Sequence, residues 1–198
     1  MTDPIIWLRS LQTPTEQAMR DFAALAAEAG LVDVAYRRVD GPLGSLLIAA
    51  TRRGVVRLAF PEEQEDAVLE ELSERVSPRL VEAPALVDEP VRQLDEYLAG
   101  GRTSFDLPID YALTSGFRDE VLRATARIPY GRTSTYLSVA AEAGSPRGAR
   151  AVGRALSGNP VPIIIPCHRV IGSNGSLIGF GGGLELKAAL LRSEGIKI

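Results

Sequence analysis

Short apolar runs bounded by turn residues lie near the start of the chain, and apolar residues at helical spacing fill most of the remainder. Three runs rich in Val, Leu, Ile and Ala predict β-strands, at residues 34–39, 45–51 and 55–60. The two segments between these runs carry the Gly and Pro residues typical of hairpin turns. The pattern therefore predicts a three-stranded antiparallel sheet.

Helices are predicted before and after these strands. The N-terminal helix is expected to begin at the capping sequence Thr13-Pro14-Thr15-Glu16 and to end at Gly30. One face of this helix is formed by Ala18, Phe22, Leu25, Ala26 and Ala29. Two further helices are predicted, an acidic one over residues 62–76 and another over 89–98.

The second part of the chain carries signals for three closely spaced helices. The first is predicted over residues 117–128, and Thr135 is placed to cap a short helix over 136–143. Ser145 then caps a third helix, with Pro146 at its first position and Gly158 beyond its end. Two short helices joined so tightly predict a helix-turn-helix.

These elements predict an α+β fold with a small N-terminal α/β domain and a mainly helical C-terminal domain. The boundary is expected in the loop over residues 108–115. The predicted divisions are a helical extension over 1–33, an α/β domain over 34–112 and a C-terminal domain over 113–198.

The third predicted helix, in SPRGARAVGRALSGN, combines arginines with very small residues. Arg147, Arg150 and Arg154 are spaced so that they share one helix face. Gly148, Ala149, Ala151 and Gly153 between them would let another backbone come close. Either this is a solvated face near a neighbouring helix, or the helix enters a nucleic-acid groove.

The formal charge is divided unevenly along the chain. Residues 1–116 contain 11 Lys and Arg against 20 Asp and Glu, a net charge of −9. Residues 117–198 contain 11 against 5, a net charge of +6. A split of this size indicates that the second part meets a polyanion, although two solvated surfaces with a chance asymmetry would also produce it.

Composition excludes several classes of protein. No apolar stretch approaches the roughly 18–20 residues of a membrane span, and the N-terminus lacks the pattern of a secretion signal. A single cysteine forms no internal disulfide, which favours a reducing, cytoplasmic location. One Cys and one His are too few soft ligands for a structural zinc site, so no metal is expected.

The only cysteine and the only histidine of the chain, Cys167 and His168, are adjacent in the segment IIIPCHRVIG. A lone cysteine is most often a small core residue, but one beside a histidine is a candidate nucleophile. In an extended strand the two side chains would point to opposite faces. Either Pro166 places the pair on a turn or a water molecule bridges them, and Glu194 is a candidate to orient the imidazole.

The segment NPVPIIIPCHRVIGSNGSLIGFGGGLELKAALLRSEG, residues 159–195, resembles the active-site region of the O6-alkylguanine-DNA alkyltransferases. These are also called methylated-DNA–protein-cysteine methyltransferases. The combination of PCHRV after an apolar strand, an Asn-Pro-Val-Pro entry and a Gly-Gly-Leu exit is specific. The resemblance extends upstream through PYGRTSTYLSVA to about residue 117 and, more loosely, over 34–110. It implies a ribonuclease-like N-terminal domain and a C-terminal domain with a helix-turn-helix and a PCHR active-site loop.

The resemblance implies a role for each matching residue of the reactive centre. Cys167 would be the alkyl acceptor, activated through water by His168, which Glu194 would orient. Asn159 would be the hinge between the recognition helix and the active-site loop. Tyr136 would lie against the flipped base and assist proton delivery to it.

The resemblance also implies contacts with DNA and with the base. Arg150 would be the finger that fills the gap left by a flipped nucleotide. The other expected DNA contacts are Arg147, Arg154, Gly148, Ala149, Ser145 and Thr135. The base pocket is expected to contain Val170, Phe180, Gly181 and Lys187, with the carbonyls of Cys167 and Val170 reading the guanine amino group. Phe180 departs from the tyrosine common in the family, and Gly181 still offers a backbone N–H to O6.

The implied activity is repair of O6-alkylguanine, and of O4-alkylthymine, in double-stranded DNA. The alkyl group would pass to Cys167 as a thioether, which water does not cleave, so each chain would act once. No cofactor is expected. Binding in the minor groove would be largely independent of sequence, because phosphate contacts dominate it. A monomer in solution is expected, and cooperative binding along DNA is left open.

Three other functions compete with this interpretation. A Cys-His hydrolase or acyltransferase would need an oxyanion hole and would turn over many times. A DNA-binding module that senses alkylated bases without repairing them would lack the cysteine, which is present. A transcriptional regulator with a major-groove helix is weaker, because Gly and Ala offer few base-reading side chains.

Overall fold

The three predicted strands form an antiparallel sheet, as expected. The computed structural model describes residues 16–198, and in it the strands are β1 (Val34–Gly41), β2 (Gly44–Thr51) and β3 (Gly54–Ala59). A fourth strand, β4 (Leu80–Glu82), was not predicted and pairs parallel to β1. The order across the sheet is therefore β3-β2-β1-β4.

Both faces of this sheet are covered, because its strands alternate between two sets of apolar side chains. Leu47 and Ala49 of β2 face α3 (Glu65–Arg75), which contributes Val68 and Leu72. Leu46 and Ile48 face the opposite way, toward α4 (Asp88–Leu98) and the second part of the chain. A short 3₁₀ helix, η1 (Pro84–Leu86), precedes α4.

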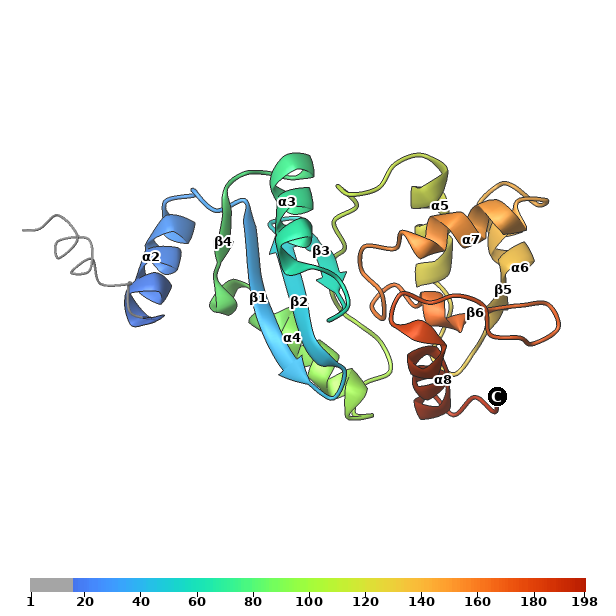
Figure 1. Ribbon diagram of the computed structural model, residues 1–198. Coiled ribbons are helices and arrows are strands. Elements are labelled where there is room, and N and C mark those ends of the chain that lie inside the picture. The colour runs from blue at the N-terminus through green and yellow to red at the C-terminus, as the bar shows by residue number, and fades with distance from the viewer. Residues whose placement is uncertain (1–15) are drawn as a thin grey trace, which may run out of the picture.

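The second part of the chain is mainly helical and lies beyond the β3 edge of the sheet (Figure 1), where it shares an apolar core with residues of β2, β3 and α4. Its helices are α5 (Phe117–Ala126), α6 (Tyr136–Glu142), α7 (Ala149–Ser157) and α8 (Gly183–Ser193). Two short parallel strands, β5 (Ser134–Thr135) and β6 (Val170–Ile171), bring α6 beside the segment that follows the Cys-His pair. The α+β fold class is thus confirmed.

The helix-turn-helix region follows the predicted pattern except at the start of its second helix. Thr135 caps α6, since its hydroxyl oxygen accepts a hydrogen bond from the Ser138 N–H at 3.1 Å. Ser145 does not cap α7, and that prediction is wrong. Ser145 to Gly148 form a turn closed by the Gly148 N–H on the Ser145 carbonyl at 2.7 Å, so α7 begins only at Ala149.

This turn changes two expectations about the arginine-rich segment. Arg147 lies in the turn, so it does not share a helix with Arg150 and Arg154. The absence of a side chain at Gly148 has a structural reason, because a Cβ there would lie 2.6 Å from the Ser145 Oγ and 2.9 Å from its carbonyl oxygen. The small residue at this position is needed for the turn.

The N-terminal helix α2 (Glu16–Glu28) packs through a different face from the predicted one. Ala23 and Ala26 are buried against β1 and η1, whereas Phe22 and Leu25 are 59% and 66% exposed. The small alanines allow close packing on the edge of the sheet, so the larger apolar side chains lie outside the contact. The predicted capping residues Thr13 to Thr15 lie outside the described residues.

The connection between the two parts of the chain is fixed to the sheet. The Val55 N–H donates to the Pro108 carbonyl at 2.9 Å, and the Asp110 N–H donates to the Val55 carbonyl at 2.9 Å. This pairing extends the β3 edge with the segment that leads into α5. Between residues 16 and 198, no helix is long and apolar enough to cross a membrane.

Candidate active site

A tight turn leads directly into Cys167. The apolar strand predicted at this place is not formed, so that prediction is wrong. Residues 161–165 turn back on themselves, with the Ile165 N–H donating to the Val161 carbonyl at 2.9 Å and Ile163 in the left-handed region at φ 72°. Cys167 then opens a short 3₁₀ helix, η2 (Cys167–Arg169). The three isoleucines are buried through this turn without forming a strand.

Asn159 holds the turn and also contacts the thiol. Its Oδ1 accepts a hydrogen bond from the Val161 N–H at 3.0 Å, and its Nδ2 donates to the Ile165 carbonyl at 3.0 Å. The same Nδ2 lies 3.2 Å from the Sγ of Cys167. Burial raises the pKa of this thiol, while the Asn159 hydrogen bond and the charge of Lys187 act in the opposite direction.

His168 is fully buried beside Cys167, with one ring nitrogen paired and the other free. Its Nε2 lies 2.7 Å from the Oε1 of Glu194. Its Nδ1 is buried and has no hydrogen-bond partner among the described residues. Burial lowers the pKa of His168, and the hydrogen bond to Glu194 opposes that effect. A neutral imidazole with a free acceptor nitrogen can take a proton from a thiol through one water molecule.

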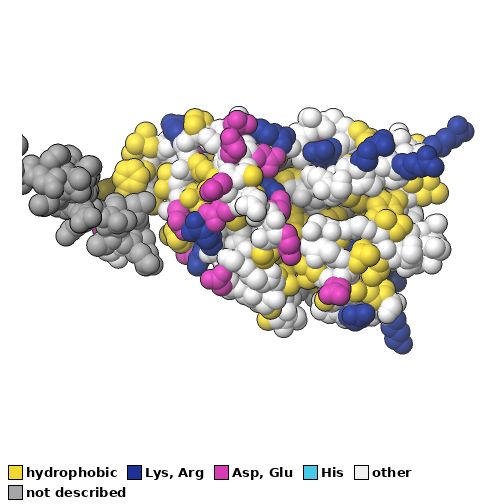
Figure 2. Space-filling view, in the orientation of Figure 1, with side chains coloured by type: hydrophobic (Ala, Val, Ile, Leu, Met, Phe, Trp, Pro, Cys, Tyr) yellow, Lys and Arg dark blue, Asp and Glu magenta, His cyan; other side chains and the backbone are white. Residues whose placement is uncertain are grey.

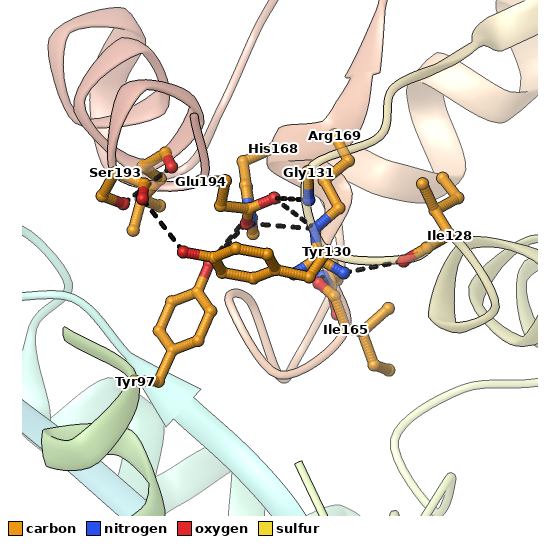
Figure 3. A network of polar contacts seen from close by, with 11 residues as sticks. Tyr97, Ile128, Tyr130, Gly131, Ile165, His168, Arg169, Ser193 and Glu194 are labelled. Carbon is orange, nitrogen blue, oxygen red and sulfur yellow. Dashed lines mark hydrogen bonds and ion pairs between the residues drawn. The ribbon is translucent and has the colours of Figure 1, made fainter. Parts of the chain in front are cut away.

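Glu194, at the end of α8, accepts hydrogen bonds from several buried donors (Figure 3). The Tyr97 hydroxyl donates to its Oε1 at 2.5 Å, and the Gly131 N–H donates to its Oε2 at 3.1 Å. The Nε of Arg169 lies within 3.0 Å of both carboxylate oxygens. Burial alone would raise the pKa of Glu194, but the hydrogen bonds from His168, Arg169 and Tyr97 lower it to about 2.

Two residues of this network, Arg169 and Tyr97, were not predicted from the sequence. Arg169 is the last residue of the PCHR motif, but no role was predicted for it. Its Nη1 also donates to the Ile128 carbonyl at 2.7 Å. Tyr97 belongs to α4, far from Glu194 in the sequence, and no local pattern marks it. The predicted trio of Cys167, His168 and Glu194 is brought together as expected.

Tyr136 and Lys187 meet at one backbone carbonyl of the loop that follows β6. The Tyr136 hydroxyl donates to the Ile178 carbonyl at 2.8 Å, and the Lys187 Nζ donates to the same carbonyl at 2.8 Å. Lys187 is completely buried and also donates to the Val170 carbonyl at 2.7 Å. Burial lowers the pKa of Lys187 to about 8.

A cavity of about 350 Å³ opens beside the thiol, between the two parts of the chain. Its walls include Cys167, Asn159 and Gly181 from the second part and, from the first part, Arg57 of β3 and Phe60, which follows β3. Phe180 does not line this cavity. Its ring packs edge-on against Phe60 at 5.6 Å and stands 6.2 Å from the ring of His168.

The residues expected to contact DNA lie on or near the surface of α6, α7 and the turn between them. Arg147, Arg150 and Arg154 are exposed, and the guanidinium group of none of the three forms a hydrogen bond or ion pair within residues 16–198. Thr135, Ser145, Gly148 and Ala149 are partly exposed. On the face seen in Figure 2, acidic side chains gather near α3, whereas basic ones stand over α6 and α7.

The described part of the chain offers a thiol nucleophile but no cluster of metal ligands. Among residues 16–198, no group of three His, Cys, Asp or Glu side chains could hold a metal ion. The chemistry available at this site is attack by the thiol, with a buried imidazole–carboxylate pair to receive its proton.

Comparison with known proteins identifies the family. Residues 34–111 match the ribonuclease-like domain of 6-O-methylguanine DNA methyltransferase, and residues 116–196 match its DNA binding domain. The constitutive methylated-DNA–protein-cysteine methyltransferase of Bacillus subtilis is 41% identical over 167 residues, which cover 81% of this chain and 95% of that protein. The chain belongs to the methylated-DNA–protein-cysteine methyltransferase family.

Other members of this methyltransferase family agree in sequence and in fold. The Mycobacterium leprae methyltransferase is 42% identical, over 80% of this chain and 90% of that protein. The crystal structure of Mycobacterium tuberculosis OGT in complex with DNA matches with a TM-score of 0.69 and 38% identity, over 81% of this chain and 92% of that one. The resemblance predicted from the PCHRV segment is confirmed. Residues 1–33 lie outside both family matches.

Proposed function

We propose that the protein repairs O6-alkylguanine, and O4-alkylthymine, in duplex DNA by moving the alkyl group onto its own Cys167. The observation that carries the proposal is the buried thiol at a cavity, beside a histidine whose Nδ1 is free and whose Nε2 is held by Glu194. Membership of the methyltransferase family supplies the substrate class.

The proposed reaction is a direct displacement at the alkyl carbon. The S–C bond forms as the C–O6 bond breaks, and the electron pair of the broken bond goes to the guanine. The thiol proton passes through one water molecule to the Nδ1 of His168. Burial raises the pKa of Tyr136, so its hydroxyl is protonated before the reaction. That hydroxyl donates its proton to the departing guanine, which leaves a phenolate on Tyr136 and an imidazolium on His168, and exchange with solvent returns the proton from His168 to Tyr136.

The product explains why each chain would react only once. The alkyl group ends as a thioether on Cys167, and a thioether has no activated carbonyl for water to attack. Within residues 16–198, Cys167 is the sole free thiol, and the whole sequence contains no other cysteine. The reaction would therefore be irreversible and stoichiometric.

Access to O6 requires the nucleotide to leave the base stack, because this atom lies inside the duplex. We place α7 in the minor groove, where Arg150 would fill the gap and Arg147 and Arg154 would contact phosphates. Gly148, Ala149, Ser145 and Thr135 would contact the backbone. The exposure of the three arginines, and the absence of partners for them in the described residues, supports this arrangement.

The flipped base would occupy the space beside Cys167. Asn159, which joins α7 to the reactive turn, would act as the hinge of this segment. The carbonyls of Cys167 and Val170 would accept from the guanine amino group, and the Gly181 N–H would donate to O6. Lys187 would fix the loop that carries these groups, through the Val170 and Ile178 carbonyls.

Intact mass after reaction tests the proposal. The protein is incubated with excess duplex DNA containing O6-methylguanine, and we expect exactly one added methyl group, on the peptide that contains Cys167. Cys167→Ser should gain none and should still bind the DNA. Product formation beyond one equivalent per chain would contradict a single-use protein and favour a Cys-His hydrolase.

A further inference from the structure

The first part of the chain reaches into the reactive centre through one side chain. Tyr97 lies on α4, is only 4% exposed, and directs its hydroxyl away from the sheet toward Glu194 (Figure 3). Its ring is held by Phe105 at 5.0 Å and by Tyr130 at 6.2 Å between centroids. The position of the hydroxyl is therefore fixed by packing on both sides.

The Tyr97 hydroxyl shares one acceptor with the imidazole. It lies 2.5 Å from the Oε1 of Glu194 and 3.3 Å from the Nε2 of His168, while that Nε2 lies 2.7 Å from the same Oε1. Both groups fit as donors to the carboxylate, so Nε2 carries the hydrogen. A neutral imidazole then has its lone pair on Nδ1, the atom left without a partner among the described residues.

We propose that Tyr97 is a positioning residue by which the first part of the chain keeps His168 neutral, with Nδ1 free to accept the Cys167 proton. The Tyr97 hydroxyl offsets part of the negative charge on Oε1. A bare carboxylate at that distance would stabilise the imidazolium form, in which Nδ1 already carries a proton and cannot act as a base.

The charged groups around His168 show why this adjustment matters. Glu194, from the end of α8, is the anion that favours the imidazolium. Arg169 of η2 and Lys187 of α8 are cations that disfavour it, and Cys167 adds a negative charge only when ionised. Arg169 already pairs with both oxygens of Glu194, so Tyr97 supplies the remaining donor to the oxygen that faces the ring.

This inference rests on the proposed function for its catalytic consequence, but the protonation of His168 can be measured without any alkyl transfer. His168 is the only histidine of the chain, so a tag-free protein labelled with ¹⁵N-histidine gives imidazole signals that need no assignment. The nitrogen shifts report both the pKa and the tautomer. We expect the wild-type protein to be neutral at pH 7.5, with hydrogen on Nε2.

Tyr97→Phe removes the donor and keeps the ring. We expect the His168 pKa to rise by about one unit, because a hydrogen bond to a charged group is lost. Transfer should then slow most at low pH and recover as the pH rises above the new pKa. The matched control is Tyr130→Phe, which removes a hydroxyl on the same wall that donates to the Ser193 carbonyl and not to Glu194. It should leave the titration unchanged.

Several outcomes would overturn the inference. An Nδ1–H tautomer or an imidazolium in the wild-type protein at pH 7.5 would do so, whether or not any variant folds. An unshifted titration in folded Tyr97→Phe, or a transfer rate reduced equally at every pH, would show that Tyr97 only packs. In a Glu194→Gln background, Tyr97→Phe should cause no further shift of the His168 pKa. A further shift would contradict the proposal that Tyr97 acts through the Glu194 carboxylate. If the titration behaves as expected but Cys167 gains no methyl group, the proposed function fails and the role of Tyr97 stands.

Discussion

At the scale of single residues, Asn159 connects the shape of the reactive turn to the reactivity of the thiol. Asn159→Ala removes the Nδ2 donor that lies 3.2 Å from the Sγ of Cys167. That donor favours the thiolate, so its loss should raise the thiol pKa further and reduce the thiolate fraction near neutral pH. We expect the reaction of Cys167 with a small alkylating reagent to slow about tenfold at pH 7.5. A factor of this size corresponds to the free energy of one hydrogen bond to a charged group.

The pH dependence separates this effect from a general loss of structure. The difference between the variant and the wild-type protein should narrow as the pH rises, because both thiols become ionised. Asn174→Ala, which changes the only other asparagine and lies on an exposed turn, is the control and should react like the wild type. A tenfold loss that persists at every pH would show that Asn159 acts only by holding the turn.

A site residue was easier to predict from the sequence when the residues it contacts lie close to it along the chain. Cys167 and His168 are adjacent and unique, so they were found from the residues themselves. Glu194 was named as a candidate to orient the imidazole, and the resemblance over residues 159–195 implies the same role. Tyr97 was missed because its partner is 97 positions away and its ring looks like any core aromatic of α4.

At the scale of elements, the strands and helices with strong apolar patterns were predicted, and the irregular segments were not. The three isoleucines before Cys167 look like a strand, but the side chain of Asn159 satisfies the backbone of a turn there. Ser145 and Pro146 look like a helix start, yet the Gly148 N–H closes a turn on the Ser145 carbonyl first. Local propensity was outweighed in both places by hydrogen bonds that the pattern does not reveal.

The position of Arg150 on helix α7 leads to a testable prediction. Arg150 stands in its first turn, exposed and without a partner in the described residues, whereas Arg147 precedes the helix. A residue that fills the place of a flipped base must be planar and able to stack, which lysine is not. We therefore expect Arg150→Ala and Arg150→Lys to slow methyl transfer from duplex DNA by about 10- to 100-fold, the cost of unstacking a base.

The free base O6-benzylguanine needs no flipping and provides the comparison. The reaction of both Arg150 variants with this free base should stay near the wild-type rate. The transfer rate from duplex DNA is measured at saturating DNA, so that affinity does not limit it. Arg147→Ala is the matched control, because a phosphate contact should affect affinity more than the saturated rate. Equal losses on both substrates would show that Arg150 supports the active site structurally.

At the scale of the whole molecule, the two parts of the chain share a core but divide the charge. Leu46 and Ile48 of the sheet and Tyr97 of α4 belong to the same apolar cluster as Cys167 and the helices around it. The acidic excess stays on the first part and the basic excess on the second. The boundaries predicted at residues 33 and 112 remain a prediction, while the continuous core explains how the first part reaches the reactive centre.

The charge division predicts how DNA binding responds to salt. Arg147 and Arg154 are exposed and free of partners in the described residues, so each can release a counterion when it meets a phosphate. The logarithm of the affinity should fall linearly with the logarithm of salt concentration, by roughly 0.9 per phosphate contacted. Arg154→Ala should make that slope shallower by about one, with a similar loss of affinity for every DNA sequence.

The control is Arg92→Ala, which changes an exposed arginine of α4 that pairs with Glu89 and Glu96 and should leave the slope unchanged. Fluorescence anisotropy across a salt series measures both slopes. Binding that is independent of salt, or a slope that changes equally in the two variants, would show that the basic part of the chain is not the surface that meets DNA.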